Sequence, residues 1–123
     1  MGQVGHFELA VADVDRAKAF YEKVFGWVLE KQIESWDTYL ALHTGEEKEP
    51  GISGAFAKRQ SESDTLVNTI DTGDIDNAIT KVEANGGRIT FAKCPISGVG
   101  YLAYFVDPEG NQWGMMQRDA SIE

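Results

Sequence analysis

The sequence predicts an α+β fold made of two tandem copies of a β-α-β-β-β unit. Three observations lead to this prediction. The chain has 123 residues, of which 42% are hydrophobic, and this suits one compact domain. A short acidic motif occurs twice, and β-like runs flank both copies. We therefore expect a single domain over residues 1–123, with module one at about residues 4–59 and module two at about residues 66–118.

The repeated motif reads Asp13-Val14-Asp15-Arg16-Ala17 in the first copy and Asp74-Ile75-Asp76-Asn77-Ala78 in the second. Each copy runs on to a glycine, Gly26 or Gly87. The offset is 61 residues at both ends, since 74 − 13 and 87 − 26 give the same value. Equal offsets over this distance indicate a duplicated structural unit.

Both copies of the motif open a predicted helix. Apolar residues recur at i, i+3, i+4 and i+7, as on one face of an amphipathic helix. These residues are Ala17, Phe20, Tyr21 and Val24, and then Ile75, Ala78, Ile79 and Val82. Asp13 and Asp74 are placed to cap the first free N–H groups, and Gly26 and Gly86-Gly87 to supply the left-handed residue that ends a helix.

One β-like run precedes each predicted helix and three follow it. The runs cover residues 4–11, 27–33, 38–43 and 52–57, and then residues 66–70, 88–91, 101–106 and 112–117. Tyr39-Leu40-Ala41 recurs as Tyr101-Leu102-Ala103 at an offset of 62, which requires one residue of slippage. Asp107-Pro108-Glu109-Gly110 has the sequence of a type I turn, so the last two strands should be antiparallel neighbours.

Composition and charge exclude several classes of partner. The chain has 20 acidic and 11 basic residues, with a net charge of −9, and its basic residues are scattered. Nucleic acid and anionic membranes are therefore not expected to bind. The only cysteine, Cys94, cannot form an internal disulfide, and neither a signal peptide nor a long apolar run appears. We expect a cytoplasmic protein.

These residues resemble the vicinal oxygen chelate superfamily, which contains glyoxalase I, extradiol dioxygenases, methylmalonyl-CoA epimerase and bleomycin resistance proteins. The resemblance runs from about Val4 to Gln117 and is most specific at residues 12–27, 86–87 and 104–111. It implies that the two modules pair to enclose a cavity and that the protein is a homodimer. The chain is most similar to small predicted glyoxalase-like lyases, which keep the turn at 107–111 and a later glycine and glutamine.

The resemblance also implies metal ligands on the first and fourth strands of each module, and this chain lacks most of them. His6 matches one ligand position, but the offset of 61 leads from His6 to Val67, which has no lone pair. Gly54 and Gly114 stand where carboxylates are expected. Catalytic transition metals normally take three or more protein ligands. We therefore predict no family-type metal and no cofactor, with a metal on atypical ligands such as His6 and Glu8 as an alternative.

The first strand carries the candidate catalytic residues. With a period of two, His6 and Glu8 share one face, and Phe7 and Leu9 the other. If the modules enclose a cavity, the pair points into it at a spacing of about 7 Å along the strand. Histidine has a reference pKa of about 6.5, so such a pair could move protons on an enolisable carbonyl compound. A polar face that is merely solvated or hydrogen-bonded is the alternative.

The candidate ligand-binding residues are Phe56, Thr69 and Met116. Thr69 is the counterpart of Glu8 by the offset of 61. Phe56 and Met116 share strand parity with Gly54 and Gly114 and should line the cavity implied by the resemblance. The two glycines either leave space for a ligand or allow close packing of strands.

Two functions follow from these expectations. The first is a metal-independent lyase or isomerase acting on a small carbonyl or thioester metabolite, with His6 as the proton-transfer group. The second is a non-catalytic protein that binds or sequesters a small organic molecule, as bleomycin resistance proteins do. An acidic surface would suit a cationic ligand in that case. The sequence leaves both open and identifies no ligand.

Overall fold

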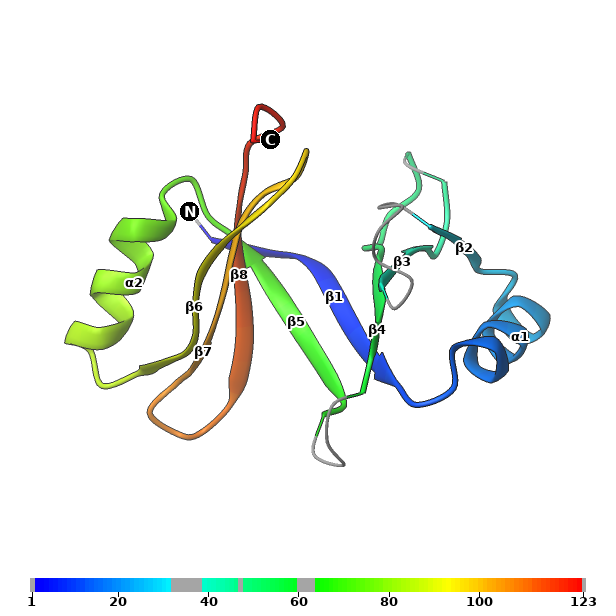
Figure 1. Ribbon diagram of the computed structural model, residues 1–123, viewed down its shortest axis with the longest axis horizontal. Coiled ribbons are helices and arrows are strands. Elements are labelled where there is room, and N and C mark those ends of the chain that lie inside the picture. Colours follow the sequence, from blue (N-terminus) through cyan, green and yellow to red (C-terminus); the bar gives the residue numbers. More distant parts are fainter. Residues whose placement is uncertain (1, 32–38, 47, 60–63, 123) are drawn as a thin grey trace. The chain divides into compact units, whose positions relative to one another are not determined.

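The computed structural model of the protein describes residues 2–31, 39–46, 48–59 and 64–122. The chain divides into two compact units (Figure 1). The N-terminal unit is His6–Leu66, and the C-terminal unit is Val67–Glu123 together with Met1–Gly5. Along the chain, the elements follow the order β-α-β-β-β twice, so the predicted α+β class is confirmed. No helix in the described ranges is long and apolar enough to span a membrane.

Within its described residues, the N-terminal unit contains one helix and a set of four paired strands. The elements are β1 (Gln3–Val11), of which the part from His6 onward belongs to this unit, α1 (Val14–Phe25), β2 (Val28–Lys31), β3 (Tyr39–His43) and β4 (Gly54–Lys58). The strands lie in the order β2-β3-β4-β1, and β1 runs parallel to β4 while the other neighbours are antiparallel. The parts of the predicted strands 27–33 and 38–43 that fall within residues 32–38 lie outside the described residues.

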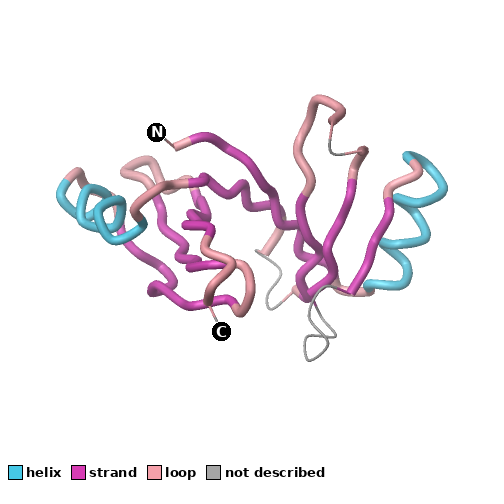
Figure 2. The backbone as a smooth tube through the Cα atoms, turned by 90° about the horizontal axis from the view of Figure 1, so that it is seen from above, coloured by secondary structure: helices cyan, strands magenta, loops and turns pink. Residues whose placement is uncertain are grey.

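The C-terminal unit has the same arrangement. Its elements are β5 (Leu66–Asp71), α2 (Ile75–Ala84), β6 (Arg88–Ile96), β7 (Gly100–Val106) and β8 (Gln112–Arg118). The strands lie in the order β5-β8-β7-β6, with β5 parallel to β8 and the other neighbours antiparallel. Figure 2 shows a helix beside its own strands in each unit.

The helix boundaries follow the capping residues in the sequence. The Asp13 and Asp74 carboxylates each accept a hydrogen bond at 3.0 Å from the backbone N–H three residues further on. Gly26 ends α1 in the left-handed conformation, at φ 70°. At the end of α2 the cap is Asn85, and Gly86 supplies the positive φ one residue later. The predicted N-caps and the Gly26 cap are therefore confirmed.

Strand β6 is longer than the sequence predicts. The expected run ended at residue 91, whereas β6 continues to Ile96 and pairs Pro95 with Tyr101. Proline cannot donate a ladder hydrogen bond, but it is tolerated here because β6 is the last strand in the order of its unit. A tight turn, with the Val99 N–H donating to the Ile96 carbonyl at 3.0 Å, then leads into β7.

The β7–β8 connection is the predicted tight turn. The Gly110 N–H donates to the Asp107 carbonyl oxygen at 2.9 Å, and β7 and β8 are antiparallel neighbours as expected. The Asp107 carboxylate accepts hydrogen bonds from the Asn111 side chain and from the backbone N–H groups of Asn111 and Glu109. These bonds, those from Asn111 first, lower the pKa of Asp107 below its ordinary value.

Each unit has its own hydrophobic core under its helix. In the N-terminal unit the buried core residues are Val11, Leu29, Leu42 and Phe56. Those of the C-terminal unit are Ile75, Ala103 and Met115. Full burial of a Val, Leu, Ile, Phe or Met side chain contributes roughly 1.5–3 kcal/mol to the free energy of unfolding. These clusters therefore hold each helix on its sheet. One face of each set of strands is therefore committed to packing, and chemistry has to be sought elsewhere.

Candidate functional site

Strand β1 presents two chemically different faces. Phe7 and Leu9 pack against the core under α1. Because side chains alternate along a strand, His6 and Glu8 lie on the opposite face. Both are half-buried, and the Nε2 atom of His6 is buried. Glu8 pairs with Ala55 of β4, so a small side chain stands next to the carboxylate.

Phe56 lies on the other face of the sheet, in the core under α1. It is fully buried, it pairs with Leu9, and its ring centroid is 5.8 Å from that of Tyr21. The prediction that Phe56 forms part of the apolar wall of a ligand cavity is therefore wrong. The register of β4 is the physical reason, because it places Ala55, not Phe56, beside Glu8.

Gly54 and Gly114 do not occupy equivalent positions. Gly54 pairs with Phe7 on the helix side of its strands. Gly114 pairs with Thr69, and the next pair along, Ile70 with Met115, faces the core under α2, so Gly114 lies on the side away from that helix. The structural counterpart of Gly114 is therefore Ala55, at an offset of 59 (114 − 55). A shift of one residue turns a side chain to the opposite face, so the predicted equivalence assigned Gly54 to the wrong face.

The recurring Tyr-Leu-Ala sequence shows the same slip. Leu42 faces the core under α1, and its neighbour Ala41 pairs with Ala55 on the Glu8 face. In the other unit Ala103 belongs to the core under α2. An offset of 62 equates Ala41 with Ala103 and so places them on opposite sides of their sheets. The strand segments correspond at an odd offset instead.

Thr69 and Met116 lie together on the face of the C-terminal strands that points away from α2. Thr69 is 1% exposed and Met116 is 5% exposed, and each belongs to a pair in the β5–β8 ladder. Tyr104 lies on the same face, because it pairs with Gly114 in the β7–β8 ladder. The sequence did not lead us to predict Tyr104 as a site residue. The predicted turn carried the necessary signal, because it pairs Val106 with Gln112, and counting two residues away from the turn on each strand pairs Tyr104 with Gly114.

Close packing accounts for both glycines. A Cβ atom at Gly114 would lie 3.0 Å from both the Thr69 Oγ1 atom and the Tyr104 Cε1 atom. At Gly54 a Cβ atom would collide with the carbonyl oxygen of Phe7. The sequence left two explanations for these glycines, space for a ligand or close packing of strands. The structure supports close packing.

The residues present do not fit the metal that the superfamily resemblance implies. Next to Glu8 the sheet offers Ala55, and next to Thr69 it offers Gly114, and neither alanine nor glycine has a side-chain donor. Across the described ranges, no three His, Cys, Asp or Glu side chains lie close enough together to hold an ion.

The second histidine of the chain has a different environment. His43 lies at the end of β3, and its Nε2 atom is 3.2 Å from the Glu30 Oε1 atom of β2. Both side chains are exposed. An exposed hydrogen bond of this kind contributes little to stability. The two histidines therefore differ: His6 is half-buried on β1, and His43 is exposed beside Glu30.

The chain is similar to one known protein family and to several solved structures. The model of the Glyoxalase/Bleomycin resistance protein/Dioxygenase superfamily matches residues 3–115. A hypothetical protein from Bacillus halodurans is similar in structure, with a TM-score of 0.72 and 16% identity over 99% of this chain and 98% of that one. No curated protein matches the sequence significantly.

Several methylmalonyl-CoA epimerase structures are also similar. The enzyme from Mycobacterium tuberculosis has a TM-score of 0.69 and 15% identity, over 94% of this chain and 87% of that one. A Streptomyces coelicolor epimerase variant in complex with 2-nitronate-propionyl-CoA has a TM-score of 0.71 and 14% identity, over 98% and 97% of the two chains. At these identities the likeness shows a shared fold.

Proposed function

Because the chain belongs to the Glyoxalase/Bleomycin resistance protein/Dioxygenase superfamily, we propose that it is an isomerase or lyase that moves a proton on a small thioester. The observation that carries this proposal is the His6–Glu8 pair on the face of β1 opposite the core under α1. The fold likeness supports the choice of thioester, since one similar epimerase structure contains methylmalonyl-CoA. The proton moved is the one on the carbon next to the thioester carbonyl.

Proton transfer at this carbon requires a base on one side of a planar enolate and an acid on the other. His6 takes the proton and leaves an enolate, and the carboxylic acid form of Glu8 returns a proton to the opposite side; His6 then loses its proton to solvent and Glu8 regains one, which restores both groups for the next turnover. The backbone positions of residues two apart on a strand are separated by about 7 Å, so both side chains can reach one small substrate on the same face. The thioester loses one proton from C2 and gains one there, so its composition is unchanged.

Two further residues are proposed to contact the ligand. Thr69 would supply a hydroxyl group and Met116 an apolar surface, because both lie on the face of the C-terminal strands away from α2. Tyr104 of the same face joins them as a candidate. The homodimer implied by the resemblance remains a prediction.

Deuterium exchange tests the proposal. The protein, treated with EDTA, is incubated in D2O with methylmalonyl-CoA and, separately, with propionyl-CoA, and loss of the C2 proton is followed by NMR. We expect exchange faster than in buffer alone with at least one of these thioesters. Exchange at the buffer rate with both, or exchange that requires an added divalent metal, would contradict the proposal. Binding without exchange would favour the non-catalytic alternative.

A further inference from the structure

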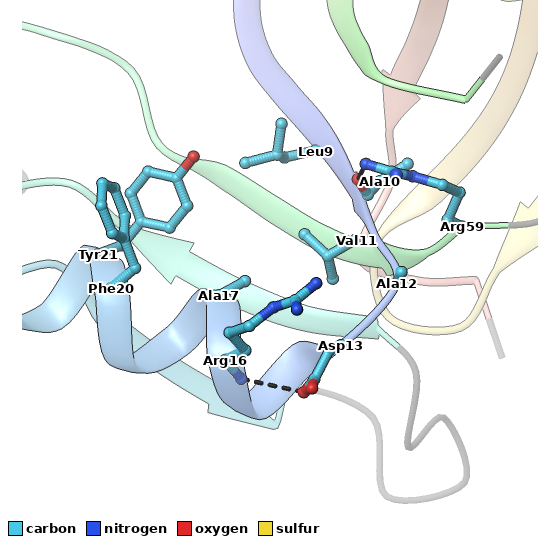
Figure 3. A pocket seen from close by; sticks show the side chains of 10 residues that line it. All are labelled: Leu9, Ala10, Val11, Ala12, Asp13, Arg16, Ala17, Phe20, Tyr21 and Arg59. Atoms are coloured by element: carbon cyan, nitrogen blue, oxygen red, sulfur yellow. Dashed lines mark hydrogen bonds between the residues drawn. The ribbon is translucent and has the colours of Figure 1, made fainter. Parts of the chain in front are cut away.

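The N-terminal unit contains a pocket of about 400 Å³ between the end of β1 and the first half of α1 (Figure 3). Its apolar wall is formed by Leu9, Val11 and Ala17, and the rings of Phe20 and Tyr21 close one end. These β1 side chains belong to the helix side of the strand, so the pocket lies on the face opposite His6 and Glu8. It is a separate site from the proposed catalytic pair.

Two guanidinium groups border this pocket, from Arg16 of α1 and from Arg59 just after β4. Arg59 is held in place, because its backbone N–H donates to the Val11 carbonyl at 2.8 Å and its Nη2 group to the Ala10 carbonyl at 3.2 Å. In Figure 3 the Arg16 side chain extends from α1 toward Val11, and the Arg59 side chain extends to Ala10 of β1.

Neither guanidinium forms an ion pair within the described part of the chain. This contrasts with Arg118, whose Nε atom lies 3.3 Å from an Asp71 carboxylate oxygen. The chain has 20 acidic residues for 11 basic ones, so carboxylate partners are abundant. The pocket therefore places two cations beside an apolar wall where a ligand can supply the counter-charge.

One carboxylate, that of Asp13, also lines the pocket. It accepts a hydrogen bond from the backbone N–H of Arg16 at 3.0 Å, drawn as a dashed line in Figure 3, and so caps the N-terminus of α1. Two arginines against one aspartate leave a net charge of +1 around the pocket. An anion with one negative charge would neutralise this excess.

The remaining walls of the pocket favour an anion that carries a flat apolar group. Phe20 is 54% exposed, and its ring meets that of Tyr21 edge to face at 5.1 Å. Tyr21 is fixed in turn by stacking on Trp27, with ring centroids 4.9 Å apart. An aromatic ring gains most from such surroundings, because it can pack on the aliphatic wall and against the exposed phenylalanine.

We propose that this pocket binds a small aromatic carboxylate, whose carboxylate group is held by Arg16 and Arg59 and whose ring packs between Ala17 and Phe20. Guanidinium groups suit this ligand, because they present parallel N–H donors that match a carboxylate. The volume falls in the lower part of the usual range for small-molecule sites, roughly 300–1,000 Å³. A benzoate-sized compound is therefore the appropriate probe.

A titration with benzoate, followed by ¹H–¹⁵N NMR on the full chain, tests the proposal. We expect chemical shift changes at the amides of Arg16, Ala17, Phe20 and Arg59. Arg16→Gln and Arg59→Gln should each weaken binding by about tenfold or more, since a hydrogen bond to a charged group is lost. Arg88→Gln is the matched control, because Arg88 is exposed on β6 and outside the pocket, and it should bind benzoate as the wild type does.

Neutral benzamide and inorganic phosphate complete the experiment. Both should bind at least tenfold more weakly than benzoate, because one lacks the charge and the other the ring. No shift changes up to 10 mM benzoate, equal binding of benzamide or phosphate, or equal loss of binding in the Arg88→Gln protein would overturn the proposal. Deuterium exchange on thioesters should be unchanged in Arg16→Gln, so failure here and failure of the proposed function are distinguishable.

Discussion

The Gln117 side-chain oxygen of β8 accepts a hydrogen bond from the Ile75 backbone N–H at 3.0 Å. This bond satisfies one of the N–H groups that a helix leaves without an internal partner in its first turn. Ile75 is also the one buried residue of α2. The contact therefore fixes the start of α2 against the last strand, and it gives Gln117 a structural role.

Gln117→Leu should lower the free energy of unfolding by about 1–3 kcal/mol, because a half-buried N–H loses its acceptor. Gln117→Glu keeps the acceptor and should cost much less, since a carboxylate is favourable at a helix N-terminus. Urea unfolding measures both changes. The exposed Gln112 at the other end of β8 provides the control, Gln112→Leu, and equal midpoints for the two leucine variants would refute the assigned role.

Phe56→Ala should destabilise the protein by about 3–5 kcal/mol, because it empties a fully buried site in the core under α1. Phe91→Ala is the comparison, since Phe91 is 46% exposed, and its cost should be clearly smaller. Thermal or urea unfolding provides the values. Similar small losses in both variants would show that Phe56 is not a core residue.

Gly54→Ala should cost more than about 2 kcal/mol, because the new Cβ atom would meet the Phe7 carbonyl of the neighbouring strand. Gly73→Ala provides a matched control, as a Cβ atom there has no described heavy atom within 4 Å. Its effect should be small or slightly stabilising, through the unfolded state. If Gly54→Ala were as stable as Gly73→Ala, close packing at β1–β4 would not explain the glycine.

Asn111→Ala should raise the pKa of Asp107 toward its ordinary value of 3.8, because the side-chain hydrogen bond from Asn111 is the largest cause of its lowering and is the one that the substitution removes. The folded pKa lies below the unfolded one. The carboxylate therefore stabilises the fold above the unfolded pKa, and this contribution is lost as the pH falls through the folded value. An NMR titration of the Asp107 carboxyl carbon measures the change, with Asn77→Ala as control. An unchanged pKa in Asn111→Ala would contradict the described turn.

The sequence predicts the helices and their caps well because those signals are local. Asp13, Asp74 and Gly26 each act on backbone groups within a few residues, so their effect can be read from spacing alone. The alternation of His6 and Glu8 with apolar neighbours likewise identifies the two faces of β1. Such features do not depend on which strands become neighbours.

The faces of β4 could not be predicted in the same way. Residues 54–57 read Gly-Ala-Phe-Ala, which is apolar or small at every position, so alternation does not distinguish one face from the other. Only the pairing of Ala55 with Glu8 settles the face, and that pairing depends on tertiary contacts. The pocket could not be predicted from the sequence for the same reason. Arg16 and Arg59 are 43 residues apart in the chain, and only tertiary contacts bring them to one pocket.

The central claim is that His6 is the proton-transfer group, and the two histidines of the chain allow a direct test. C2 deuterium exchange on the thioester that the wild-type protein turns over is measured for His6→Gln and for His43→Gln, whose side chain is exposed beside Glu30. Loss of a general base typically costs about 10²–10⁴ in rate, so His6→Gln should fall at least about 100-fold while His43→Gln stays at the wild-type rate. Wild-type exchange in a folded His6→Gln protein would contradict the claim.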